Sequence, residues 1–493
     1  MTGGRRDAGK AWCAGLLLLA AIAARAGDPP AEPLTIMPFQ TATFVSDAPS
    51  AAEISGFAEF SSRLLYWTDM PREPVVLAGQ VLKTSLMPFI DEWRGVRPVG
   101  SVAASGIVRT RVTEAYRALH GPRLARITVG AETVIVPPAA VDVLAGEAGE
   151  IPCVIENRRS SPVRIEIGAA GAGSPAFSAT LAAGQSVGVF LALPGELSAG
   201  PVSWGVAVDG QASPFAFTVR RHARGSLAVE VLDETGVPTP ARVYLTGSDR
   251  RAHAPAGVMH RIVSGECGQP FAGDAYFHTA GKFEVVLPAG EATVEIVKGL
   301  EYQPQRLSVR VGPGKSGTTT IRLARTARLQ AEGWYSGDVH VHANLFAQKR
   351  VTPRDVLLVA QAEDLNVVNL LPCNDPRTAT ITDRQYFTGR PDAVSTPRHI
   401  LYFNEEMRND IYGHVGFLNL KTFVEPAYFG WPHSPFPYDH PGNFPQAVQA
   451  KAQGGVVTYV HPGLPSEFPV DIALGVADTI DVMSQNAEDL PTD

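Results

Sequence analysis

A run of acidic and imidazole side chains, Asp338-Val-His-Val-His342, stands out near the start of the chain's last third. In an extended strand, side chains two residues apart lie on the same face, so His340 and His342 would point together. Two imidazoles on one face can bind a divalent metal ion, and Asp338 could fix a histidine tautomer from behind. Taken alone, such a pair can equally be a polar surface face.

More residues of the metal-ligating type follow along the chain. Glu405 and Glu406 come directly after an apolar strand pattern, His414 follows a glycine, and His461 follows the apolar run 456–460. Seven of the chain's 12 histidines lie between positions 340 and 461. The predicted metal ligands are His340, His342, Glu406, His414 and His461, with Asp338 in a supporting role.

Strands and helices that alternate must position these residues. Thr352 as N-cap, followed by proline, predicts a helix to about residue 364. Strand patterns at 367–371, 399–404 and 456–460 alternate with this helix and with a second one at 444–453. Alternation of this kind predicts parallel βα units, whose strands deliver side chains to a common rim at their carboxyl ends. We therefore expect Glu406 and His461 to lie at strand ends.

Upstream of residue 332 the pattern of apolar and polar residues changes twice. Residues 27–127 are mixed and of unknown type, although 108–119 has helical spacing. Short alternating strand patterns at 128–222 predict an immunoglobulin-like β-sandwich. A second strand-rich unit is predicted at 223–326. Its strand–turn–strand pattern, which ends in Lys298-Gly-Leu-Glu-Tyr302, resembles the carboxypeptidase-regulatory-like β-sandwich. At 493 residues the chain is long enough for several such domains.

The N-terminus has the layout of a secretory signal at 1–26. Arg5, Arg6 and Lys10 precede an apolar run at 11–24, and Ala26 closes a small-x-small cleavage site. The run is short for a permanent membrane span, and no second one of that length follows. We expect a periplasmic or secreted protein with no stable membrane insertion.

Charge argues against nucleic acid as a partner. The full chain has 42 basic and 49 acidic residues, and residues 1–26 contain four of the basic residues and one acidic residue, Asp7. Without this segment, 38 basic and 48 acidic residues remain, which gives a net charge of −10. A net acidic surface repels phosphate backbones, so a small-molecule substrate is expected instead.

Cysteine usage adds no metal motif. Cys13 leaves with the signal, and the odd set Cys153, Cys267 and Cys373 is widely spaced. We expect these three to be small buried hydrophobic residues.

Four motifs in order resemble the PHP-type (polymerase and histidinol phosphatase) metallohydrolases, in particular the CehA/McbA-like branch. The Asp-x-His-x-His motif ends at His342, the Gly-x-Glu motif matches Asn404-Glu-Glu406, and Gly413-His414 and Val460-His-Pro462 follow. The resemblance covers residues 332–493. It implies a distorted βα barrel with two or three metals and identifies Glu406, in preference to Glu405, as a bridging carboxylate.

The chain also departs from that family pattern. Where the family has Thr-Asp-His, this chain reads Pro372-Cys-Asn374-Asp375, and the family's final Asp-x-His does not occur before Asp493. Asp375 and Asp481 are acidic residues that could replace missing ligands. The barrel is therefore expected to be C-terminally truncated or degenerate.

Two classes of function follow. The first is a secreted hydrolase that uses one to three Zn, Mn or Fe ions to activate water against a phosphoester, ester, carbamate or amide. The second is a non-catalytic, multi-domain binding or surface protein in which a degenerate PHP-like domain has lost its activity. The histidine and glutamate set favours the first class, whereas the altered Asn374 region favours the second.

Overall fold

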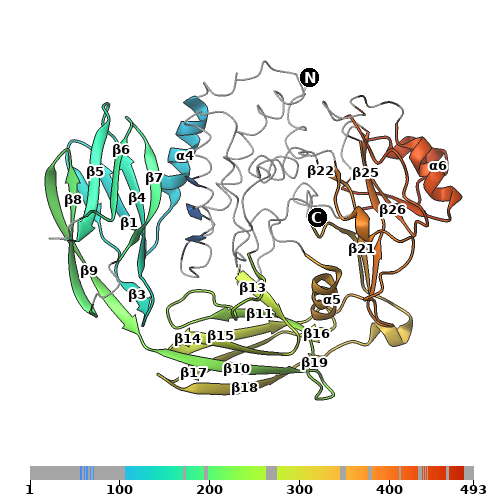
Figure 1. Cartoon of the computed structure of the whole chain (residues 1–493), viewed down its shortest axis with the longest axis horizontal. Coiled ribbons are helices and arrows are strands. Elements are labelled where there is room, and N and C mark those ends of the chain that lie inside the picture. The colour runs from blue at the N-terminus through green and yellow to red at the C-terminus, as the bar shows by residue number, and fades with distance from the viewer. Residues whose placement is uncertain are drawn as a thin grey trace, which may run out of the picture.

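The computed structural model describes most of the chain from residue 106 onward (Figure 1). The described ranges are 106–169, 174–193, 198–262, 275–344, 351–375, 380–409, 412–430, 442–461 and 466–481, with scattered residues at 56–70 and 436–440. The predicted signal at 1–26 and Cys267 lie outside them. Within the described part, no helix is both long enough and apolar enough to cross a membrane.

The described part of the chain is built mainly of β-strands in several sheets with few helices, which confirms the prediction of a strand-rich chain. Helix α4 (Gly106–Ala118) falls where helical spacing predicted it and lies against strand β7 (Ser186–Ala192). A side chain at Gly188 of β7 would collide with Phe60 and Tyr116, so glycine is required for this close approach.

Two sheets share one apolar core between residues 125 and 222. Alternating burial, as in β5, gives each sheet one inward apolar face, and Ile127, Ile165 and Trp204 are fully buried there. The first sheet contains β2 (Thr133–Val136), β1 (Ala125–Val129), β4 (Glu150–Asn157) and β7 in that order. The second contains β3 (Val141–Leu144), β9 (Gln211–His222), β8 (Gly200–Val208), β5 (Val163–Ala169) and β6 (Phe177–Leu181).

A second pair of sheets follows directly, because β9 ends at His222 and β10 (Arg224–Leu232) begins two residues later (Figure 1). Leu227, Phe277 and Val294 are among its fully buried core residues. One sheet has the order β14 (Lys282–Pro288), β10, β18 (Ser316–Arg322). The other has the order β12 (His260–Ile262), β13 (Ala275–Thr279), β11 (Ala241–Thr246), β15 (Gly290–Val297), β17 (Gln305–Val311), and β16 (Tyr302–Gln303) pairs with β19 (Ala324–Arg325).

The last third begins with a parallel three-stranded sheet. Strands β20 (Gly337–Val341), β21 (Val367–Leu370) and β24 (Ile400–Phe403) lie in that order, and helix α5 (Pro353–Ala362) connects the first two. Helix α5 begins as predicted, because Thr352 and Asp355 form a capping box before Pro353. Short elements flank this sheet: η3 (Leu329–Glu332), the β22 (Asn374–Asp375) and β23 (Thr380–Ile381) pair, and η4 (Arg384–Tyr386).

A second sheet of the last third is mixed, so the prediction of uniformly parallel βα units is wrong there. Strand β25 pairs antiparallel with β26, with Asn409 opposite Gly413, and β26 pairs antiparallel with β28. The chain reverses within three residues, whereas a parallel connection needs a dozen or more. The order is β27 (Tyr428–Phe429), β25 (Glu405–Asn409), β26 (Gly413–Leu418), β28 (Val456–Tyr459), β29 (Thr479–Ile480), with α6 (Phe444–Ala452) and α7 (Phe468–Ala473) before the last two strands.

The second β unit and α5 are joined by buried polar contacts. Glu363, which caps the end of α5, lies 2.5 Å from the guanidinium of Arg242 and 2.7 Å from Nε2 of His278. Lys298 Nζ donates to the backbone carbonyls of Pro240 and Gln361. Burial lowers the pKa of Lys298 to about 8. These contacts fix α5, and with it the parallel sheet, against β11 and β13.

We expect Glu363→Gln to loosen the docking of α5, because it removes the negative charge that Arg242 and His278 both contact. The loss is about 1–3 kcal/mol for a hydrogen-bonded, largely buried ion pair. Hydrogen exchange of peptides covering α5 would accelerate. Glu230→Gln is the matched control, since its 2.7 Å pair with Lys282 is solvent-exposed and contributes little. Unchanged α5 protection in Glu363→Gln would contradict this role.

Candidate metal centre

The candidate centre lies beyond the carboxyl ends of the parallel strands, where the two sheets of the last third meet. His340 belongs to β20 and His342 follows its end, with an irregular register between Asp338 and Val341. Their Nε2 atoms lie 3.0 Å apart. Both imidazoles therefore point to one spot, as the alternation of side chains in a strand predicts.

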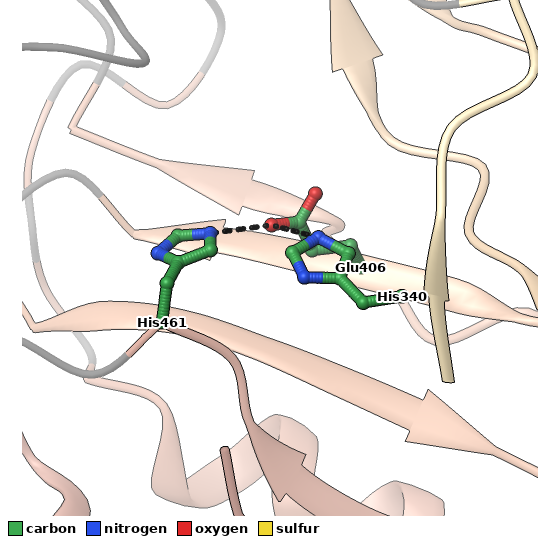
Figure 2. A group of neighbouring side chains, drawn as sticks. All are labelled: His340, Glu406 and His461. Atoms are coloured by element: carbon green, nitrogen blue, oxygen red, sulfur yellow. Dashed lines mark ion pairs between the residues drawn. The ribbon is translucent and has the colours of Figure 1, made fainter. Parts of the chain in front are cut away.

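Glu406 is the residue around which the other predicted ligands gather. Its side chain is fully buried, and its Oε1 lies 3.0 Å from Nδ1 of His414. The same oxygen lies 3.6 Å from Nε2 of His340 and 3.7 Å from Nε2 of His461 (Figure 2). His342 Nε2 lies 3.0 Å from the other oxygen, Oε2. The structure thus brings all five predicted ligands together around one carboxylate.

The strands that carry these residues differ from the prediction. Glu406 lies inside β25 and His414 inside β26, not at strand ends, whereas His461 does follow the end of β28. Apolar patterning predicted the end of a strand at residue 404 because Glu405 and Glu406 are charged. In the structure the chain continues into a new strand whose charged residues are buried.

Glu405 and Glu406 have opposite roles because neighbouring side chains in a strand point to opposite faces. Glu405 is also fully buried, but its Oε2 accepts a hydrogen bond from the backbone of Val424, 2.8 Å away. Burial raises the pKa of Glu405 well above its usual range. Of the two glutamates, only Glu406 faces the histidines.

Electrostatics hold Glu406 in its anionic form. Burial favours its protonated form, but Arg408, His342 and His414 outweigh burial and hold the pKa of Glu406 well below its usual range. Burial lowers the pKa of His342 and lowers that of His414 to about 4. For His340 burial acts in the same direction, but the contact with Glu406 prevails and raises its pKa.

The tautomer of His342 is set by a backbone carbonyl. Its Nδ1 donates to the carbonyl oxygen of Leu371 at 2.9 Å, which leaves the Nε2 lone pair facing Glu406 and His340. That role had been predicted for Asp338. Asp338 is instead exposed, and its Oδ1 accepts the backbone N–H of His340 at 3.1 Å.

Two buried polar atoms at the centre have no hydrogen-bond partner within the described residues. They are Oε1 of Glu406 and Nδ1 of His414, which face each other at 3.0 Å without hydrogen-bond geometry. Buried polar atoms are rarely left unpartnered, because desolvation then costs free energy with no compensation. A cation placed among these atoms would satisfy both, so the donor set fits a metal ion.

Cys373 lies next to the centre, with ligand atoms of His342 and Glu406 within 4.8 Å. Its Sγ is 3.5 Å from Nδ1 of His342, the nitrogen that faces Leu371. Burial raises the pKa of the Cys373 thiol, so the thiolate that a metal would need is disfavoured. Cys373 and Cys153 are both buried and free, as expected of small hydrophobic residues.

Sequence reasoning missed Arg408 as part of the centre. Arg408 is buried, and its Nε donates to Oε2 of Glu406 at 2.8 Å. The spacing Glu-x-Arg within one strand was the signal that could have found it. Asp481, noted only as a possible substitute ligand, accepts the backbone N–H of His461 at 3.1 Å and lies 4.0 Å from Nδ1 of His340.

Other candidates lie away from the centre or outside the description. His399 precedes β24, and its Nδ1 contacts the carbonyl of Leu365 at 2.8 Å. Asn374 is buried in β22, while the side chain of Asp375 is outside the described part of the structure.

A buried polar network supports the strand that carries His414. Asn443 Nδ2 donates to the carbonyl of Gly413 at 3.1 Å and to the hydroxyl of Tyr459 at 3.2 Å. Tyr459 in turn donates to Oδ2 of Asp471 at 2.7 Å. Helix α7, strand β28 and the start of β26 are thereby tied together beneath the centre.

Comparisons with known proteins show no family for this chain. No family profile and no curated protein matches it. Among solved structures, the minor pilin GBS52 of Streptococcus agalactiae is 14% identical over 42% of this chain and 96% of its own, with a TM-score of 0.18. The Bacillus anthracis TIE protein (12%, 55% and 54%, TM-score 0.16) and Legionella pneumophila phospholipase PlaB (13%, 24% and 28%, TM-score 0.14) are similarly distant. Similarities this weak carry no argument about fold or function.

The Asp471 carboxyl makes a pH-dependent prediction. Burial raises its pKa from 3.8 to about 6, so the folded state binds this proton more tightly than the unfolded state does. Stability from this group is complete below about pH 4 and is lost as the pH rises through 6, by up to about 3 kcal/mol. Asp471→Asn should therefore gain stability relative to the natural chain between pH 4 and 7, measured by urea unfolding.

Asp478→Asn is a control with the opposite sign. Burial disfavours the charged form of Asp478, but the hydrogen bond from Lys451 prevails and lowers its pKa. Its stabilisation is therefore complete above the unfolded pKa and disappears only as the pH falls below about 4, so the stability difference between this variant and the natural chain should stay nearly constant from pH 4 to 7. If the stability difference from the natural chain changed with pH in the same way for both variants, the buried network would not hold the Asp471 proton as described.

Proposed function

We propose that this chain is a metal-dependent hydrolase that acts through metal-activated water. The observation that carries the proposal is the buried Glu406 carboxylate, whose unpartnered Oε1 faces three imidazole nitrogens within 3.7 Å. The ion would be held by Glu406, His340 and His461, with His342 and His414 alongside.

A purely structural ion-pair cluster explains the same residues less well. Such a cluster would leave Oε1 of Glu406 without a hydrogen bond, although Arg408 already satisfies Oε2. A divalent cation bound by Oε1 and by the imidazole nitrogens around it removes this difficulty.

Imidazole and carboxylate donors suit Zn, Mn or Fe, and the donor set does not choose among them. When bound, such an ion lowers the pKa of a coordinated water from about 15.7 toward 7 and polarises the bond to be cut. His461 is the most exposed of the predicted ligands, because its side chain is 38% exposed against 24% for His414 and 20% for His340. We expect a small substrate to enter there.

This chain's own residues supply the remaining chemistry. Glu406 would offset part of the ion's positive charge, and the Leu371 carbonyl keeps the Nε2 lone pair of His342 available. Asp481 positions the backbone of His461 and offers a carboxylate near Nδ1 of His340 that can accept a proton.

We further propose that residues 332–493 form part of a distorted βα barrel of the PHP type. Support comes from the parallel β20-β21-β24 sheet, the α5 crossover, and the position of the centre beyond the strands' carboxyl ends. The substrate class follows as a phosphoester, ester, carbamate or amide, cleaved outside the cytoplasm after export by the signal at 1–26.

Metal content tests the proposal. The purified natural chain should carry at least one equivalent of Zn, Mn or Fe by elemental mass spectrometry, and His340→Ala/His342→Ala should lose it because both imidazoles face Glu406. His399→Ala is the matched control, since His399 contacts Leu365 away from the centre. Hydrolysis of ester and phosphoester substrates should fall by about two orders of magnitude or more with the metal, as expected when ligands are removed.

The proposal would be contradicted if protein that was purified without chelator and supplied with metal contained no metal. Equal metal loss in His399→Ala and in the double variant would also contradict it, because the loss would then not report on this centre.

A further inference from the structure

Arg408 divides the surroundings of Glu406 into two sides. On the Oε1 side lie His340, His414 and His461, with no hydrogen-bond partner for that oxygen among the described residues. On the Oε2 side, Arg408 Nε donates at 2.8 Å. The two oxygens of a single carboxylate therefore face different cation environments.

The guanidinium lies where a second ion would have to bind. His342, Cys373 and Glu406 form a second group of ligand atoms close enough to share an ion. Arg408 already contacts two of the three: its Nη2 lies 3.4 Å from Nε2 of His342 as well as bonding Oε2 of Glu406.

The charge at this position is permanent. A guanidinium stays protonated in proteins, and Arg408 is buried with its Nη1 directed toward the carbonyl of Asn374 at 3.5 Å. A divalent ion on the Oε2 side would have to displace this cation or bind beside it in a poorly screened environment. Strand alternation holds residues 406 and 408 on one face, so the guanidinium cannot easily leave.

We propose that Arg408 is a positioning residue that serves as a built-in second cation, so that the centre binds one metal ion on the Oε1 side of Glu406. This inference rests on the proposed metal-dependent function. Arg408 holds Oε2, which turns Oε1 toward the imidazoles. A centre that binds one ion also explains why the Cys373-Asn374 segment contains no histidine, because no second ion has to be bound there.

The test is metal stoichiometry, measured by calorimetric titration of metal-stripped full chain with Zn²⁺ and by elemental analysis after desalting. The natural chain should take up one equivalent. Arg408→Met and Arg408→His remove the permanent charge and should take up a second, whereas Arg408→Lys keeps the charge and should remain at one. Arg384→Met is the matched control, since it removes an exposed arginine–glutamate pair (with Glu425) elsewhere.

Each other outcome has a distinct meaning. Two equivalents in the natural chain, or one in both Arg408→Met and Arg408→His with circular dichroism unchanged, would overturn the role of Arg408 while leaving a metal centre in place. Loss of the first equivalent in Arg408→Lys and Arg408→Met alike would reduce Arg408 to a structural residue. No binding in the natural chain would instead overturn the proposed function and this inference with it.

Discussion

The buried carboxylate of Glu406, of which only one oxygen is hydrogen-bonded among the described residues, is the constraint on which the last third of the chain depends. A carboxylate in a protein interior is costly unless both oxygens are partnered. Here Arg408 satisfies Oε2, while Oε1 faces imidazoles and has no hydrogen bond among the described residues. Any account of this protein must explain what stabilises that oxygen, and a metal ion does so with the donors present.

The fold supplies the geometry by joining two kinds of sheet. The parallel sheet ends at Phe403, and a single residue, Asn404, separates it from β25 of the mixed sheet. Asn404 is fully buried and contacts Asn369 in the parallel sheet and the backbone of Leu420, two residues after the end of β26. This fixed junction carries Glu406 past the carboxyl edge of β20 and β21, where His340 and His342 point. The partly buried contacts of Glu363 with Arg242 and His278 hold α5, which connects β20 and β21, against the second pair of sheets.

Local patterns predicted those features that depend on neighbours in sequence. Strand alternation placed His340 and His342 together, the Thr352 capping signal located α5, and alternation upstream indicated the strand-rich units. The antiparallel return at Gly413 was missed because apolar patterning ends a strand at charged residues, and β25 buries charges that only tertiary partners compensate. Arg408 was missed for the same reason. Its importance depends on Glu406 and His342, and His342 is 66 residues away in sequence.

X-ray absorption at the metal edge of the purified full chain tests the central claim most directly. The account predicts a stoichiometric ion with only nitrogen and oxygen as nearest atoms, at about 2.0–2.1 Å if the ion is zinc, with the outer scattering of several imidazoles. A sulfur neighbour at about 2.3 Å would place the ion on Cys373 and contradict the arrangement around Glu406. A chain that holds no stoichiometric metal would contradict the claim itself.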